Sequence, residues 1–308
     1  MIEVKKSIET GQPRGLFDIL QQLQNGSYGA TQYHNVYHVN ANSGKDSYNK
    51  GAGKSWDRAY KTMVFALARS GENISTSDLG YGRGWSARNA VFAQGTFSEP
   101  LVALADKTDI IGCGEGITMT RLVGTHVPVS DAYATRLINL EFRDDGNAGT
   151  CFTHASGTIE FHNCIWRPVI SYAPAVALAL TNPTGITISN CQFLPLLTTP
   201  NSTAAITIHL TDAVQSCRIE NSIIHGATGI DITVDGTHTY CDCMIINNII
   251  HATTEVIDDA SDDWYVINNR MISDGVVASM IDANAARAAG NIMAGSDSAR
   301  TYPFAVTS

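Results

Sequence analysis

Two aspartates carry the strongest candidate chemistry in this chain of 308 residues. Asp231 and Asp258 fall, within one residue, at matching places in two successive repeats of the sequence, in a column that aligns Ala177 and Thr207 before them and Asp282 after them. Neighbouring strands of a sheet lie about 4.8 Å apart, so the two carboxylates are expected about one strand spacing apart. That separation suits the carboxylate pair of a retaining glycosidase or, with further oxygen ligands, a calcium ion. Mutual repulsion would raise the pKa of one of the pair.

The same aspartates fit a second interpretation, in which they are solvated acids that keep the strand edges soluble. Arginine is sparse on the neighbouring strands, where Arg218 and Arg270 are the nearest candidates. We therefore expect the chain not to be an enzyme. If it is one, Asp231 and Asp258 are the residues to test.

Other chemical signals are weaker. His225 and His251 occupy matching repeat positions and are expected to stack, but two histidines alone make a poor metal site. The glycine-rich stretch from Gly51 to Ser55 lacks a phosphate-binding motif, because Tyr48 stands where that motif requires a glycine. The sequence shows no recognisable Ser-His-Asp or Cys-His pattern of a nucleophilic catalytic site.

The elements that must position these residues come from a repeat of a short apolar strand, an asparagine and a second short strand. Its asparagine column comprises Asn139, Asn163, Asn190, Asn221, Asn247 and Asn268, with Gly290 in the last copy. Successive steps are 24, 27, 31, 26, 21 and 22 residues. The positions two before and three after this column are apolar in every copy, which indicates a solenoid with one coil per repeat.

Asparagine tolerates the left-handed backbone conformation better than most residues, and glycine tolerates it best. The column therefore predicts a sharp bend between two strands. Stacked side-chain amides are expected to hydrogen-bond along it. The column that follows is mostly small or amide-bearing.

A strand, a one-residue asparagine bend and a second strand, repeated at coil length, resemble the right-handed parallel β-helix of the pectate-lyase-like superfamily. The resemblance covers about residues 89–295. It implies an all-β, single-stranded solenoid with an N-terminal capping helix. The scaffold hosts lyases, hydrolases and non-enzymatic virion parts, so the resemblance does not imply one activity.

Four segments are predicted. Residues 1–33 contain a short amphipathic helix at about 14–24, which serves as an attachment or oligomerisation segment or packs on the solenoid. Residues 34–88 form a strand, a loop and a helix that caps the solenoid. This helix is expected to start at Trp56, with Ser55 as its N-cap, and to end near Ser70 and Gly71. Residues 89–295 form the β-helix, and residues 296–308 form a tail. The docking stripe is Leu16, Phe17, Leu20 and Leu23, and the capping residues are Trp56, Tyr60, Met63 and Leu67.

Composition limits the class of protein. Only 16% of residues are charged, and the net charge of −9 makes a nucleic-acid-binding face unexpected. The first ten residues have no apolar core of a signal peptide, and no run is long enough to span a membrane. Among seven cysteines, Cys164 with Cys191 and Cys217 with Cys243 share columns. Each pair is either two buried thiols or a disulfide.

These observations favour a virion structural protein of a tailed bacteriophage, located in the virion: a tailspike, a fibre or a capsid-decorating spike. The alternative is a polysaccharide lyase or glycoside hydrolase of the same superfamily. The resemblance implies a homotrimer that contacts other virion proteins through residues 1–33 and a host surface polysaccharide through its body. No cofactor is expected, and calcium belongs only to the alternative.

Overall fold

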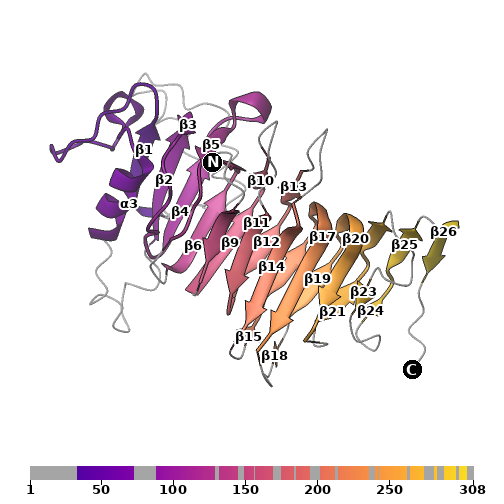
Figure 1. Ribbon diagram of the computed structural model, residues 1–308. Helices are drawn as coiled ribbons and strands as arrows, with labels where there is room; N and C mark the ends of the chain where they lie inside the picture. Colours follow the sequence, from indigo (N-terminus) through magenta and orange to yellow (C-terminus); the bar gives the residue numbers. More distant parts are fainter. Residues whose placement is uncertain are drawn as a thin grey trace, which may run out of the picture.

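The chain folds into a right-handed parallel β-helix, which confirms the predicted fold class (Figure 1). The computed structural model describes residues 33–72, 88–128, 132–144, 149–155, 157–168, 175–183, 185–194, 202–211, 214–235, 240–241, 243–261, 264–273, 281–282, 288–295 and 298–303. Coils stack side by side from the N-terminal to the C-terminal end, and nearly all strand pairs are parallel.

The strands that precede the asparagine bends form one ten-stranded sheet. In spatial order they are β1 (Tyr33–Asn40), β2 (Arg88–Gln94), β4 (Thr108–Gly112), β6 (Ala132–Ile138), β9 (Gly157–His162), β12 (Thr187–Ser189), β16 (Arg218–Glu220), β19 (Met244–Ile246), β21 (Tyr265–Ile267) and β24 (Ala288–Ala289). We call it the pre-bend sheet.

The strands that follow the bends form the post-bend sheet. They are β3 (Thr96–Phe97), β5 (Thr120–Val123), β7 (Leu140–Arg143), β10 (Ile165–Trp166), β13 (Gln192–Phe193), β17 (Ile223–Val234), β20 (Ile249–Asp259), β22 (Arg270–Ser273), β25 (Ile292–Gly295) and β26 (Ser298–Pro303). The last strand, β26, pairs with β25 in the antiparallel direction, so part of the predicted tail extends the sheet.

A third face of the coil begins with β8 (Thr150–His154), β11 (Val176–Thr181) and β14 (Ala204–Leu210). It continues into the later halves of β17 and β20 and ends at β23 (Ile281–Asp282). Because β17 and β20 run through from the post-bend sheet, the two faces join there. A small parallel pair, β15 (Val214–Gln215) with β18 (Tyr240–Cys241), lies apart from these sheets.

The six column asparagines all adopt the left-handed conformation, with φ between 51° and 57°. Gly290 takes the same place with φ 68°. Most of these side chains are exposed, and one amide contact joins two of them, from Asn163 Nδ2 to Asn139 Oδ1 at 2.8 Å. The local preference for positive φ therefore sets the bend at this column.

The longer series of side-chain hydrogen bonds lies one residue later, in a buried column that we call the inner ladder. Its members are Thr120, Leu140, Cys164, Cys191, Ser222, Asn248, Asn269 and Asn291. The Asn248 N–H donates to Asn269 Oδ1 at 2.9 Å, and Asn269 Nδ2 donates to the Ile245 carbonyl at 2.9 Å. This differs from the expectation of a ladder at the bend asparagines. Buried backbone groups need partners, whereas groups at the exposed bend reach water.

Stacked apolar columns fill the interior between the three faces. The column two residues before the bend, Leu137, Phe161, Ile188, Ile219, Ile245 and Val266, is fully buried. The column three after it begins with Phe142, Trp166 and Phe193 and changes to Ile224, Ile250 and Met271. Cys164, Cys191, Cys217 and Cys243 are free buried thiols, and burial raises the pKa of Cys164 and Cys217.

The N-terminal end of the core is covered by α3 (Met63–Glu72), which packs on β1 and β2 (Figure 1). Tyr60, Met63 and Leu67 are buried there. The prediction that the helix starts at Trp56 is wrong, because residues 56–58 form only a 3₁₀ turn. The Trp56 side chain is 39% exposed and contacts the His38 ring instead of the core.

The helix starts at Met63 because its capping groups are there. The Glu99 carboxylate accepts the Met63 N–H at 2.6 Å, and the Thr62 hydroxyl accepts the Phe65 N–H at 3.3 Å. Ser55, the expected cap, makes no side-chain capping bond. A free helix N-terminus exposes unpaired N–H groups, so a carboxylate supplied from the first coil fixes the start. The stripe Leu16, Phe17, Leu20 and Leu23 lies outside the described residues.

Candidate functional site

The structure brings the two candidate aspartates into register on the third face of the coil. Asp231 of β17 pairs with Asp258 of β20, and Asp258 pairs with Asp282 of β23. The strand partner of Thr207 in the preceding coil is Ala179, so the expectation of Ala177 is wrong by two residues. The reason is the length of the turn before β11, which the repeat does not determine.

Each strand of this face alternates between core and surface. Ile230 and Ile232 are fully buried, while Asp231 between them is half-buried. Burial raises the pKa of Asp231, and the neighbouring charge of Asp258 raises it further. A carboxyl group with a raised pKa beside a second carboxyl group is an arrangement that general acid–base chemistry can use.

A histidine lies on the same outward surface. His209 of β14 is two residues after Thr207 and pairs with Thr233. Its Nδ1 lies 3.0 Å from Thr233 Oγ1, and its Nε2 lies 3.3 Å from Asp235 Oδ2. The face therefore offers carboxylates and an imidazole on adjacent rigid strands.

The structure does not bring the two candidate arginines to this face. Arg218 lies in the pre-bend sheet and bonds Glu220 at 2.6 Å, and Arg270 lies in β22 between Ile249 and Ile292. Within the described ranges, no group of three or more His, Cys, Asp and Glu side chains is placed to hold a metal ion.

His225 and His251 are strand partners, as their spacing predicts. Their ring centroids lie 5.4 Å apart at an edge-to-face angle of 68°. Burial and the second imidazole lower the pKa of His225. The lowered pKa favours the neutral form of the His225 ring, which packs edge-to-face on the His251 ring.

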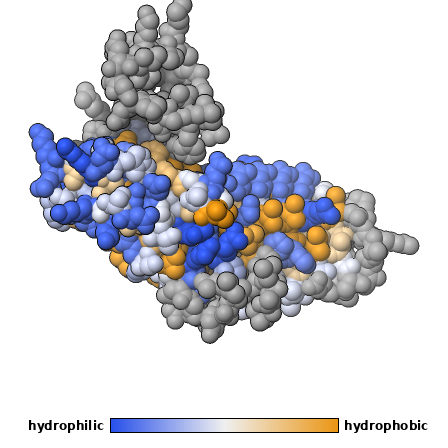
Figure 2. All heavy atoms as spheres, turned by 90° about the horizontal axis from the view of Figure 1, so that it is seen from above, coloured by the Kyte–Doolittle hydropathy of each residue, from blue (hydrophilic) through white to orange (hydrophobic). Residues whose placement is uncertain are grey.

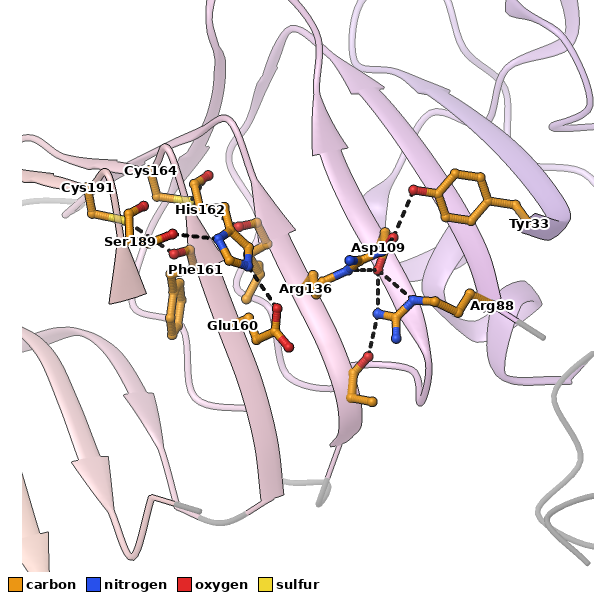
Figure 3. Close-up of polar contacts among 12 residues, drawn as sticks. Tyr33, Arg88, Asp109, Arg136, Glu160, Phe161, His162, Cys164, Ser189 and Cys191 are labelled. Carbon is orange, nitrogen blue, oxygen red and sulfur yellow. Dashed lines mark hydrogen bonds and ion pairs between the residues drawn. The ribbon is translucent and has the colours of Figure 1, made fainter. Parts of the chain in front are cut away.

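Sequence reasoning missed a polar row on the outer surface of the pre-bend sheet (Figure 3). At one end, fully buried Asp109 accepts hydrogen bonds from Arg88 at 2.5 Å, from Arg136 at 2.8 Å and from the Tyr33 hydroxyl at 2.8 Å. Burial and the Asp109 charge raise the pKa of Tyr33. The Asp109 bond is the leading cause of the raised pKa of Arg136. This group clamps neighbouring coils together.

Farther along the row, Glu160, His162 and Ser189 form a relay of side chains (Figure 3). His162 Nε2 lies 2.8 Å from Glu160 Oε2, and His162 Nδ1 lies 2.6 Å from Ser189 Oγ. The histidine bond lowers the pKa of Glu160. These residue types occur in hydrolytic triads.

Ser189, however, is only 4% exposed, which leaves its oxygen little access to a substrate. We interpret the relay as a structural tie between coils. One signal could have revealed it, because Ser189 follows His162 by the same 27 residues that separate Asn163 and Asn190. The bend column therefore also predicts this strand partnership.

No family model and no curated protein matches the chain. Among solved structures, the chain resembles the crystal structure of pectate lyase Pel9A with a TM-score of 0.48 and 10% sequence identity. The match covers 85% of this chain and 76% of that chain. At this identity the likeness concerns the coil alone, and no side-chain role is transferred. The described helices include none long and apolar enough to cross a membrane.

Proposed function

We propose that the chain is a structural protein of a tailed-bacteriophage virion, a tailspike, fibre or capsid-decorating spike, in which the β-helix is a displayed body. The supporting observation is the continuous core, which runs from the cap at α3 to Met293 and is tied by the inner ladder. Such a body is stiff along its length, because each coil is hydrogen-bonded to the next. Residues 1–33 are the docking element of this proposal.

A column of exposed isoleucines supports association with further copies of the chain. Ile223, Ile249 and Ile292 are 36%, 42% and 43% exposed. Register places Ile223 beside Ile249, with Arg270 between Ile249 and Ile292. Hydrophobic patches interrupt the hydrophilic surface of the molecule seen from above (Figure 2). Apolar surface of this kind favours packing between rods, and a homotrimer is the form that we propose.

The test is the location of the chain on particles. Antibodies against the β-helix should label virions that carry the chain in electron micrographs. Virions assembled with a chain that lacks residues 1–30 should carry no label, while the truncated chain keeps its β-type circular dichroism and melting temperature. If virions assembled with the full-length chain carry no label, the proposed display role is refuted. If virions assembled with the truncated chain still carry the label, the proposed docking role of residues 1–33 is refuted.

A polysaccharide lyase or glycoside hydrolase is the second candidate. The Asp231–Asp258 pairing and the raised pKa of Asp231 favour it. If the purified chain cleaves a polysaccharide, the double variant Asp231→Asn, Asp258→Asn should lose cleavage and keep its melting temperature. Cleavage retained by this variant would clear both residues, and robust cleavage by the unmodified chain would argue against a purely structural role.

A further inference from the structure

Three arginines from successive coils converge on one carboxylate at the surface of the post-bend sheet. This arginine cluster comprises Arg121 of β5, Arg143 of β7 and Arg167, which follows β10, around Glu141 of β7. The Glu141 side chain is only 2% exposed, whereas the arginine side chains are 25%, 32% and 46% exposed. The carboxylate is thus the buried base of the cluster, and the guanidinium groups form its outer layer.

The three guanidinium groups face Glu141 with the same atom. Nε of Arg121 lies 3.3 Å from Oε2, Nε of Arg167 lies 3.3 Å from Oε1, and Nε of Arg143 bonds Oε1 at short range. Arg121 Nη2 donates to the Ile117 carbonyl at 2.9 Å. Among the described residues, no terminal amino group of the three arginines donates a hydrogen bond to Glu141, so those of Arg143 and Arg167 are available to a ligand.

The charges of the cluster do not balance. Three guanidinium groups face one carboxylate, which leaves two positive charges, and counting buried Asp144 beside Arg167 still leaves one. The whole chain carries a net charge of −9, so this is a local reversal of sign. Guanidinium groups stay charged at every physiological pH and match the geometry of oxyanions.

We propose that the arginine cluster is a binding site for an oxyanion, namely a carboxylate, sulfate or phosphate group. The anion lies over the terminal amino groups of Arg143 and Arg167, on the solvent side of Glu141. Rigid strands and the buried carboxylate hold these donors in place before the ligand arrives, which lowers the ordering cost of binding. The inference stands apart from the proposed virion role, because it concerns the isolated chain.

The experiment follows the arginine Nε–H resonances of the full-length chain by NMR at constant ionic strength. Inorganic sulfate, inorganic phosphate, glucuronate and neutral glucose are titrated separately. We expect saturable shifts for Arg121, Arg143 and Arg167 with the anions and none with glucose. A response to glucuronate identifies a carboxylate on a sugar as a ligand, and a response to sulfate or phosphate alone restricts the site to those groups.

Arg218 provides a matched control. It is 49% exposed, and its Nε bonds one carboxylate, that of Glu220, so its pair is neutral. Arg143→Gln and Arg167→Gln should each weaken anion binding at least tenfold, while Arg218→Gln should leave it unchanged. Unaltered amide signals of Asn248 and Asn269 would show that the variants are folded. Shifts that do not saturate, or that Arg218 shares, or that survive both cluster variants, would overturn the proposal.

Discussion

The coils in the middle of the chain and those near its C-terminal end fill the same core position in different ways. Between Phe142 and Phe193 the core is aromatic, with Trp166 stacked on both rings at centroid distances of 5.0 Å and 4.4 Å. From Ile224 onward the same column is aliphatic. The backbone path is similar in both regions, so the bend and not the core residue type sets the coil.

The inner ladder changes together with the core. In the aromatic coils its members include the thiols of Cys164 and Cys191, and Cys164 Sγ donates to the Leu137 carbonyl at 3.3 Å. In the aliphatic coils Ser222 is followed by three amides, and Asn248 Nδ2 donates to the Ile219 carbonyl at 3.0 Å. Both bonds reach the residue two before the bend in the preceding coil, one strand spacing back. A thiol is a weak donor, so ring stacking carries more of the stability in the first region and hydrogen bonding more in the second.

The largest expected effect separates the two cores. Phe193→Ala should lower the free energy of unfolding by about 3–5 kcal/mol, because the change removes a stacked ring and leaves a cavity. The matched truncation Ile250→Ala removes an aliphatic side chain from the same column and should cost about 2–4 kcal/mol. Urea unfolding followed by circular dichroism measures both. Equal costs would show that the aromatic stack adds nothing specific.

The next effect tests the inner ladder. Asn269→Ala should cost about 2–4 kcal/mol, because the Asn248 N–H and the Ile245 carbonyl both lose buried partners. Cys191→Ala, in the same column of the aromatic region, should cost about 1 kcal/mol, because it removes weaker sulfur contacts. Urea denaturation of both variants measures the two losses in the free energy of unfolding. A cysteine variant as destabilised as the asparagine variant would contradict the division of roles.

A smaller effect concerns the bend that both regions share. Asn247→Ala should cost about 1–2 kcal/mol, because alanine resists the left-handed conformation that φ 57° requires. Asn247→Gly should cost far less, since glycine adopts this conformation freely. Melting temperatures of the two variants measure the difference. If glycine is as harmful as alanine, the exposed amide itself is needed and the backbone argument fails.

The smallest expected effect is on the pH dependence of stability. It compares two carboxylates on different faces of the coil, Asp231 on the third face and Glu160 in the pre-bend sheet. The pKa of Asp231 is raised on folding, so its contribution is most favourable below the ordinary aspartate pKa and declines as the pH rises through the raised value. The pKa of Glu160 is lowered, so its contribution is present above the ordinary glutamate pKa and is lost as the pH falls through the lowered value.

Melting curves of three variants between pH 3 and pH 7 test these signs. Relative to the unmodified chain, Asp231→Asn should gain melting temperature as the pH rises, and Glu160→Gln should lose it. Asp258→Asn should also gain, because it removes the repulsion on Asp231. If Asp231→Asn and Glu160→Gln follow the same direction with pH, at least one of these two environments is wrongly described.

Much of the site geometry was predictable and some was not. The pairing of Asp231 with Asp258 was predictable from the bend column only to within one residue. Asp231 lies 10 residues after Asn221 and Asp258 lies 11 residues after Asn247, and a register shift between Gly226 and Thr228 takes up the difference. Two features were not predictable. Ala179, and not Ala177, is the strand partner of Thr207, and α3 starts at Met63 and not at Trp56. The first depends on a turn whose length varies between repeats, and the second on Glu99, which lies 36 residues beyond Met63.

The sequence by itself determined the bend and the coil. Asparagine at positive φ and apolar residues at fixed distances from it are local properties, and they suffice to predict a parallel β-helix. Tertiary structure decided the polar networks. The Glu160–His162–Ser189 relay, the clamp at Asp109 and the arginine cluster all join residues of neighbouring coils, whose side chains meet only when the strands stack in register. A solenoid brings distant residues together at one strand spacing, so a shift of one residue would point these side chains to the opposite face and dissolve every network.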